Sequence, residues 1–331
     1  MTKIDLTRGY WQCPLGEESV PVSAFVTPPG QFQWRFMPFG LRNAPATFQR
    51  LMWKVLKGLE SFTGAYLDDI IIFSNSWSEH LRHLQLVFQR LQNAGLTLKK
   101  AKCIFATAIV DYIGHTIGLG RVKPRAMKVA ALVNFPRPTD GKQLRSFLGF
   151  VGYYRRFIPH FATIVSVLTD MLRKGAKFLW SDEMEAAFVE IKSRLSSNPI
   201  LHPPDFTLPF CIGVDALNVA IGAYLFQEVD GIEHPVCYYS KRFLAAQSRY
   251  STIEKDALAL LTAVRVFRVY FGNYPVRLYT DHSPLQFLNR MSHHNDRLLR
   301  HSLELQHYNI EIVHHSGAIN VIPDLLSRPC N

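Results

Sequence analysis

Seven acidic residues, set in apolar or strand-like sequence, form two groups that could bind metal ions. The first group is Asp5, Asp68 and Asp69, and the second is Asp215, Glu254, Asp281 and Asp324. Asp68 and Asp69 interrupt an apolar run from Ala65 to Phe73, where adjacent carboxylates repel each other and lose hydration. A divalent metal that handles phosphate would neutralise them. The alternative is a hairpin turn in which both carboxylates face water.

The four acids of the second group are far apart in the sequence, so only folding could gather them. Asp215 and Asp281 follow predicted strands, and the strand ends of an α/β sheet are where ligand sites usually form. Four convergent carboxylates suit two Mg²⁺ ions, one activating water and one stabilising the leaving oxygen. Two of them have simpler explanations when taken singly. Glu254 completes a capping box with Ser251, and Asp324 could compensate a helix dipole.

The elements that must position the first group alternate between strand-like and helical stretches within residues 1–117. We expect a hairpin over residues 23–36 that turns at Pro28-Pro29-Gly30, helices over 44–59 and 78–93, and a short strand over 111–117. This mixture of strands and helices predicts an α+β domain.

Residues 205–331 predict a different order of elements. We expect a strand over 210–214, strands over 221–228 and 236–240 joined through Asp230-Gly231, a helix over 251–271, strands over 276–280 and 310–314, and a short helix over 324–327. A stretch with four prolines, residues 198–209, precedes them and is typical of a linker. The order predicts a mixed α/β domain.

Basic residues concentrate in residues 118–180, which carry +10 of the chain's net charge of +11. Twelve Lys and Arg residues stand there against Asp140 and Asp170 alone, whereas a solvated helix face would intersperse acids among the bases. Such a block is typical of a grip on a phosphate backbone. The segment is predicted to be mostly helical, and the aromatic residues between Gly141 and Ile158 are expected to pack rather than to stack on bases.

Composition narrows the class of protein. A length of 331 residues favours two or three domains, and an apolar fraction of 48% with a mean hydropathy of +0.01 is typical of a globular chain. No apolar run reaches the roughly 18 residues that span a bilayer, so we expect no membrane partner. Five cysteines without a Cys-x-x-Cys motif argue against a zinc knuckle. They favour a reducing, intracellular compartment, either cytoplasm or nucleus.

An ordered series of motifs closely resembles the reverse transcriptase of gypsy-type LTR retrotransposons. The motifs are Pro38–Gln49, Tyr66-Leu67-Asp68-Asp69, Leu144–Gly149, Tyr153–Pro159, Thr280-Asp281-His282 and Pro323–Arg328. The resemblance covers essentially the whole chain, and such a series is far more specific than a lone Asp-Asp pair.

The resemblance implies a multidomain protein of α+β and α/β class. Residues 1–117 would form a reverse-transcriptase palm, a ferredoxin-like antiparallel sheet with helices, together with the remaining part of the fingers. Residues 118–180 would form a mostly helical, basic thumb, residues 181–204 a linker region, and residues 205–331 a ribonuclease H-like mixed α/β domain.

The resemblance also implies roles for individual residues. All seven acids would be catalytic and would bind the cofactor, Mg²⁺ or Mn²⁺. Further residues at matching positions would contact nucleotide or nucleic acid: Tyr10 as an aromatic gate against a ribose 2′-hydroxyl, Phe39 at the incoming nucleotide and template, Lys102 as a proton donor to pyrophosphate, Tyr112 and Gly114 in a primer-grip hairpin, and Arg155 and Arg156 in the thumb.

The implied activities are two-metal hydrolysis of the RNA strand of RNA–DNA hybrids and RNA-directed DNA polymerisation. The implied partners are RNA–DNA hybrid and primer-template nucleic acid, and deoxynucleotide triphosphates if the polymerase is active. The resemblance is also compatible with a dimer. The sequence starts four residues before Asp5, whereas the family has most of its fingers upstream, so we expect compromised polymerase activity. The alternative is a non-catalytic, domesticated or decaying copy that binds nucleic acid. The presence of all seven acids argues against decay.

Overall fold

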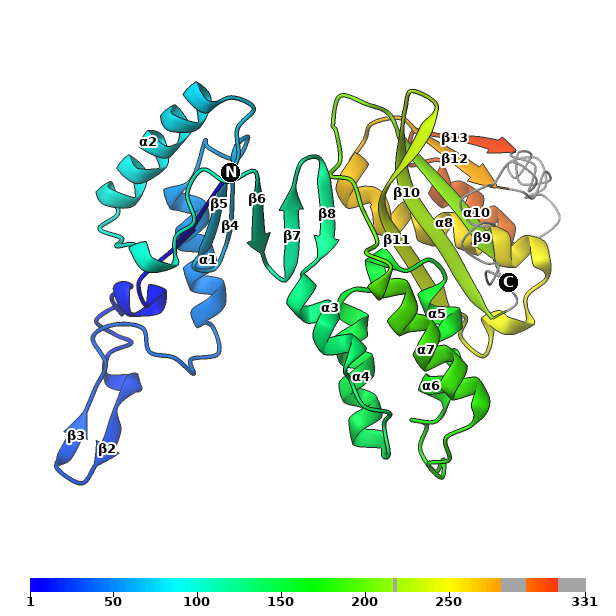
Figure 1. The fold of residues 1–331 in the computed structure, drawn as a ribbon, viewed down its shortest axis with the longest axis horizontal. Coiled ribbons are helices and arrows are strands. Elements are labelled where there is room, and N and C mark those ends of the chain that lie inside the picture. The colour runs from blue at the N-terminus through cyan, green and yellow to red at the C-terminus, as the bar shows by residue number, and fades with distance from the viewer. Residues whose placement is uncertain (217–218, 281–295, 315–331) are drawn as a thin grey trace. The chain divides into compact units, whose positions relative to one another are not determined.

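The computed structural model describes residues 1–216, 219–280 and 296–314, and of Asp215 it describes the backbone alone. The chain divides into two compact units, Met1–Leu119 and Gly120–Asn331 (Figure 1). None of the helices within these described ranges is long and apolar enough to cross a membrane.

An antiparallel sheet in the order β1-β5-β4 is the centre of the first unit. The strands are β1 (Thr2–Asp5), β4 (Thr63–Tyr66) and β5 (Asp69–Ile72), and the two helices are α1 (Ala44–Val55) and α2 (Trp77–Asn93). Buried side chains alternate along β1, so Ile4 joins the core while Lys3 and Asp5 face away from it. The core is closed by side chains of both helices, among them Phe48 and Leu91.

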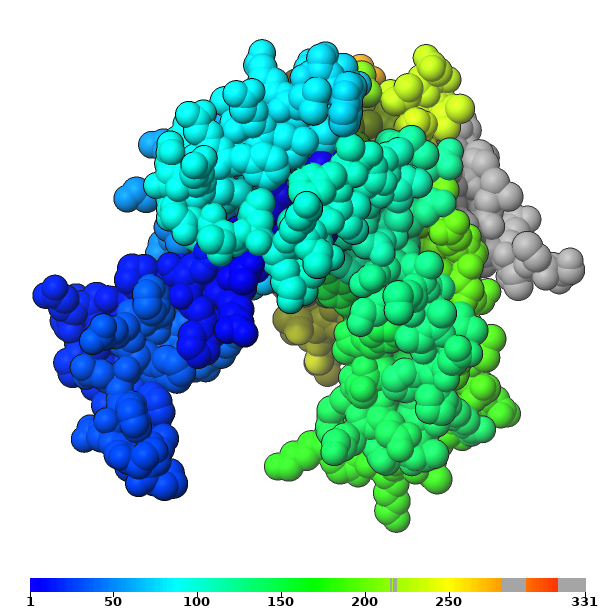
Figure 2. Space-filling view, turned by 60° about the vertical axis from the view of Figure 1, so that its left-hand side comes forward, coloured from blue at the N-terminus to red at the C-terminus, as the bar shows by residue number. Residues whose placement is uncertain are grey.

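Two hairpins and three 3₁₀ turns complete the first unit. They are η1 (Gly9–Gln12), η2 (Pro21–Ser23), β2 (Phe25–Thr27) with β3 (Gly30–Phe32), η3 (Lys100–Lys102), and β6 (Ile109–Tyr112) with β7 (His115–Gly118). The β2–β3 hairpin, predicted to turn at Pro28-Pro29-Gly30, protrudes from its unit (Figure 2). The single strand predicted over 111–117 is wrong. Ile113 and Gly114 have φ of 44° and 71°, which is the left-handed conformation that reverses a chain in a two-residue turn.

The second unit begins with mostly helical elements, as predicted for residues 118–180. They are β8 (Arg121–Pro124), α3 (Ala126–Val133), α4 (Gly141–Tyr153), η4 (Arg155–Phe157), α5 (Phe161–Ile164), α6 (Ser166–Asp170) and α7 (Asp182–Ser196). The helix α7, inside the predicted linker region 181–204, was not predicted; its apolar side chains pack into the core. The Asp140 carboxylate begins α4 by accepting the backbone N–H groups of Lys142 and Gln143 at 2.7 and 2.8 Å. Phe147 and Phe157 are buried, which confirms that much of the aromatic stripe packs rather than stacks on bases.

A five-stranded mixed sheet in the order β11-β10-β9-β12-β13 completes the second unit. Its strands are β9 (Phe210–Ala216), β10 (Ala220–Val229), β11 (Ile232–Arg242), β12 (Val276–Thr280) and β13 (Ile310–His314), and it is accompanied by η5 (Gln247–Arg249), α8 (Thr252–Phe271) and α10 (Asp296–Leu305). Strands β9, β12 and β13 are parallel, and α8 packs against the sheet (Figure 1). Asp215 therefore lies near the carboxyl end of a central strand.

One hydrophobic core joins the parts of the second unit. Residues from all three predicted segments, 118–180, 181–204 and 205–331, contribute to it, for example Phe147, Phe188 and Leu260. The proline-rich stretch before β9 is also held in place, because buried Gln227 exchanges hydrogen bonds of 2.8 and 2.7 Å with the backbone of Asp205. The strand that carries Asp215 is thus anchored at its start.

Close packing on β9 generates a stability prediction. A methyl group at Gly213 would overlap the ring of buried Tyr224, whereas a methyl group at Gly149, on α4, would meet open space. Gly213→Ala should lower the free energy of unfolding by about 1–3 kcal/mol because a packed site is overfilled. Gly149→Ala should raise it by about 0.5–1 kcal/mol because alanine favours the helix. Urea unfolding measures both changes, and equal effects would contradict the packing described for Gly213.

Candidate active site

Asp5 and Asp69 are neighbours across two strands of the first unit. Their Cα atoms are direct partners in the antiparallel register of β1 and β5. Such cross-strand partners present their side chains on the same face of a sheet. The structure therefore brings together two of the three acids that the sequence predicted to act as one group, on the face turned away from the core.

Asp68 lies beside them in the two-residue turn between β4 and β5, and it is exposed. Leu67 in this turn has a φ of 54°, which costs a non-glycine residue of order 1–3 kcal/mol. Gln49 on α1 holds the turn: its Oε1 accepts the Leu67 N–H at 2.8 Å, and its Nε2 donates to the Ala65 carbonyl at 3.0 Å. Asp68 is thus in an exposed turn, as the hairpin alternative expects, whereas Asp69 is on a strand.

Two lysines neutralise the paired acids. Lys3 Nζ lies 3.0 Å from Asp69 Oδ1, and Lys102 Nζ lies 3.4 Å from Asp5 Oδ2. The Asp5 and Asp69 side chains are 14% and 28% exposed, so both carboxylates can be reached by a cation. Within the described residues, however, no three His, Cys, Asp or Glu side chains are close enough to hold a metal together.

Sequence reasoning placed Lys102 at this site but missed Lys3 and Gln49. Lys3 had a detectable signal, since it is two residues before Asp5 on a strand and therefore shares its face. Gln49 closes the motif Pro38–Gln49, but its contact with a turn 18 residues later could not be seen locally.

Tyr10, which was predicted to contact nucleotide, lies close enough to Asp68 to feel its charge, and its ring contacts two other aromatic rings. The Tyr10 ring lies 5.3 Å from the Phe39 ring and 5.4 Å from the Phe48 ring, measured between centroids. Burial, and then the negative charge of Asp68, raise the pKa of Tyr10, so this phenol stays neutral near the acids. Phe39 is 67% exposed and is free to contact a ligand.

The predicted primer-grip hairpin also reaches the acids. The Tyr112 hydroxyl donates to the backbone carbonyl of Asp69 at 3.4 Å, and burial raises the pKa of Tyr112 to about 12. Gly114 lies at the tip of the same hairpin, where its φ of 71° suits glycine. Tyr112 can therefore steady the backbone that carries Asp69.

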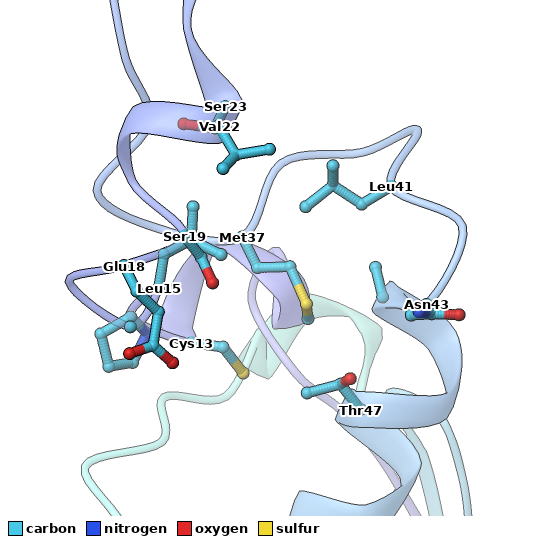
Figure 3. Close-up of a pocket in the computed structure, with 13 residues that line it drawn as sticks. Cys13, Leu15, Glu18, Ser19, Val22, Ser23, Met37, Leu41, Asn43 and Thr47 are labelled. Carbon is cyan, nitrogen blue, oxygen red and sulfur yellow. The ribbon is translucent and has the colours of Figure 1, made fainter.

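A pocket of about 420 Å³ lies elsewhere in the first unit (Figure 3). Its walls come from residues 13–23 and 37–47, and none of the predicted site residues lines it. Figure 3 shows the side chains of Cys13, Met37 and Thr47 projecting toward one another. Burial raises the pKa of Cys13, which keeps its thiol protonated and unreactive. The pocket supplies none of the chemistry predicted for the acids.

Glu254 is the member of the second group whose side chain the structure describes. Its Oε2 accepts the Ser251 N–H at 2.9 Å, so the capping box predicted from the sequence is present at the start of α8. Its Oε1 accepts a hydrogen bond from Arg297 at 2.6 Å, and Glu254 is only 8% exposed. The capping box uses Oε2, and the Arg297 guanidinium contacts Oε1. Asp281 and Asp324 lie outside the described residues, and Arg297 was missed by sequence reasoning.

The two arginines predicted to lie in a thumb differ in their surroundings. Arg155 is exposed. Arg156 is half-buried, and its guanidinium donates to the Tyr270 hydroxyl of α8 at 3.5 Å. The structure thus separates a solvent-facing arginine from one that packs within the unit, although the sequence grouped them.

Comparisons with known proteins cover both ends of the chain. Residues 1–117 match the family model of reverse transcriptase (RNA-dependent DNA polymerase), and residues 205–308 match that of the RNase H-like domain found in reverse transcriptase. The chain is 40% identical over 330 residues to the retrovirus-related Pol polyprotein from transposon 297 of Drosophila melanogaster. It is 36% identical over 333 residues to the transposon Tf2-3 polyprotein of Schizosaccharomyces pombe.

These matches use 99% of this chain but only 31% and 25% of the two relatives, so the chain spans about a third or less of their length. Among solved structures, the foamy viral protease-reverse transcriptase in complex with RNA/DNA hybrid is 24% identical, with a TM-score of 0.83 over 100% of this chain and 45% of that chain. A second foamy viral structure, in complex with ds DNA, has a TM-score of 0.83 over 95% and 56%.

The structural likeness confirms the predicted mixture of α+β and α/β folds. The family models confirm the enzyme class that the motifs implied, since one describes reverse transcriptase and the other the RNase H-like domain found in reverse transcriptase. The chain belongs to the reverse transcriptase and ribonuclease H family of LTR retrotransposon Pol polyproteins.

Proposed function

We propose that the first unit carries the catalytic centre of an RNA-directed DNA polymerase. The observation that carries this proposal is the pairing of Asp5 with Asp69 across adjacent strands, with Asp68 in the next turn. Carboxylate oxygens are the ligands that Mg²⁺ and Mn²⁺ prefer, and these three would hold the ions. Bound ions would activate the attacking hydroxyl and stabilise the leaving oxygen.

The neighbouring side chains have supporting roles in this proposal. Tyr10 stays neutral and limits the space beside the sugar of the incoming deoxynucleotide. Lys102, with Nζ 3.4 Å from Asp5, would give a proton to departing pyrophosphate. Gln49 and Tyr112 act on the backbone on either side of Asp68, which keeps the acids in register.

We propose that the second unit hydrolyses the RNA strand of an RNA–DNA hybrid, with Asp215, Glu254, Asp281 and Asp324 as the metal-binding acids. Two observations support it: Glu254 is a buried carboxylate held against a cation, and Asp215 lies on a strand that pairs in parallel with β12. Gly213 and Tyr279 are partners in that register, and Asp215 and Asp281 each come two residues later in the sequence.

The partners proposed for the whole chain are RNA–DNA hybrid and primer-template. The foamy viral structures of this fold were determined with RNA/DNA hybrid and with ds DNA. The basic block of residues 118–180 would contact the phosphate backbone, and sensing of 2′-hydroxyls in the minor groove would select RNA for cleavage.

The polymerase proposal predicts the effect of removing one paired acid. Asp69→Asn should lower primer extension roughly a thousandfold relative to the parent protein, about 4 kcal/mol of transition-state stabilisation. Glu18→Gln, which removes an exposed acid of the same unit, should leave extension unchanged. Gel analysis with Mg²⁺ and deoxynucleotides measures both. Full extension by the Asp69→Asn variant would contradict the site.

The ribonuclease H proposal predicts a folded but inactive Glu254→Gln variant. Glutamine can still accept the Ser251 N–H, so the capping box survives while the carboxylate charge is lost. Cleavage of the RNA in a hybrid should fall roughly a thousandfold, and Asp281→Asn should behave alike. Glu228→Gln, an exposed acid on β10, is the matched control and should stay active. An active Glu254→Gln enzyme would mean that Glu254 is a cap alone.

The basic segment predicts a salt dependence that distinguishes its two arginines. Arg155→Gln should flatten the slope of log K against log[salt] for hybrid binding by about one unit, because one phosphate contact is lost. Arg156→Gln should leave that slope unchanged, because its guanidinium contacts Tyr270. Fluorescence anisotropy over a salt series measures both. The same change in both variants would contradict the separation of the two side chains.

A further inference from the structure

A basic side chain from a distant helix is bound to the candidate catalytic acid of the second unit. Arg297 is the second residue of α10, and it is 43 positions from Glu254 in the sequence. Its guanidinium donates to Glu254 Oε1 at 2.6 Å. This is the oxygen that the Ser251 capping contacts do not use.

A second contact fixes the same guanidinium. It lies over the ring of Tyr250, 3.8 Å from the ring centroid, which is close enough for a cation–π interaction. Tyr250 directly precedes Ser251, the N-cap of α8. Arg297 is therefore held from two sides at the start of the helix that carries Glu254.

The charge on Glu254 explains why a cation is needed there. The residue is 8% exposed, and a buried carboxylate is costly unless an opposite charge or hydrogen bonds compensate it. The Ser251 backbone N–H and hydroxyl donate to Oε2, and the Arg297 guanidinium donates to Oε1. A divalent metal ion would compensate the same charge through the same oxygen.

We propose that Arg297 is a positioning residue of the ribonuclease H centre that competes with the metal for Glu254. Arg297 holds the carboxylate in place through Oε1. A metal held by Glu254 would draw on the same oxygen, and the guanidinium, already 42% exposed, would then turn toward solvent. This inference rests on the proposed role of Glu254 as a metal ligand. It follows that Arg297 lowers the affinity of the centre for divalent cations.

The test measures metal binding and not activity. The full chain with Asp68→Asn and Asp69→Asn, which weaken the proposed site of the first unit, is titrated with Mn²⁺ by isothermal calorimetry and electron paramagnetic resonance. Arg297→Gln should tighten Mn²⁺ binding about tenfold, which corresponds to about 1.4 kcal/mol. Arg297→Lys, which keeps the positive charge, should restore an affinity close to that of the parent chain.

Arg300 provides a matched control. It is exposed on the same helix and forms no ion pair with the described residues, so Arg300→Gln makes the same change in net charge without touching Glu254. Equal Mn²⁺ affinities for Arg297→Gln and Arg300→Gln would overturn the inference. Thermal unfolding without metal checks that each variant is folded, and Arg297→Ala, with the same expected tightening, replaces Arg297→Gln if the latter is not.

Glu254→Gln separates this inference from the function on which it rests. If Glu254→Gln binds Mn²⁺ as tightly as the parent chain, Glu254 is no ligand and both proposals fail. If Glu254→Gln weakens binding while Arg297→Gln does not tighten it, the competition alone is refuted. If both are right, Arg297→Gln should have no further effect in a chain that already carries Glu254→Gln, because the two residues act on one oxygen.

Discussion

Neutralisation of carboxylates at the ends of strands and helices is the constraint on which the rest of this structure depends. Asp69 lies against Lys3, and Glu254 lies against a guanidinium at 2.6 Å. Each basic partner is far from its acid in the sequence, and only folding brings the two together. The ion pairs that neutralise the acids therefore also join distant parts of the chain. The basic side chains hold these acids in place by balancing their negative charge.

The backbone around the acids is fixed more firmly than their sequence suggests. The left-handed Leu67 would relax on its own, but the Gln49 amide bonds both the Leu67 N–H and the carbonyl of Ala65, which lies just before the turn. Glu254 is fixed by a capping box, so its carboxylate has one direction in which to face. In both units, the acid lies on a helix or strand whose other face is buried in the core. A hydrogen bond from a polar group then fixes the backbone or side chain of the acid.

The second unit shows how the fold separates residues that the sequence groups. Arg155 and Arg156 are adjacent in a basic block, yet the first is exposed and the second contacts Tyr270, 114 positions later. The net charge of the segment therefore overstates how many of its basic side chains are exposed to a polyanion. Likewise, the proline-rich stretch before β9 is bound to the sheet through Gln227, so composition alone overstates its freedom.

Local patterns were enough to predict most elements. α8 and the hairpin around Asp230-Gly231 follow from caps, turn residues and apolar spacing, which act within a few residues. The acids were found from their unusual apolar settings and from ordered motifs. The sequence did not reveal which cation would neutralise which acid, or which oxygen of Glu254 would remain after capping. Those contacts join positions that are 43 or more residues apart, as for Arg297 or for Lys3 and Asp69, and only the packing of distant elements determines them.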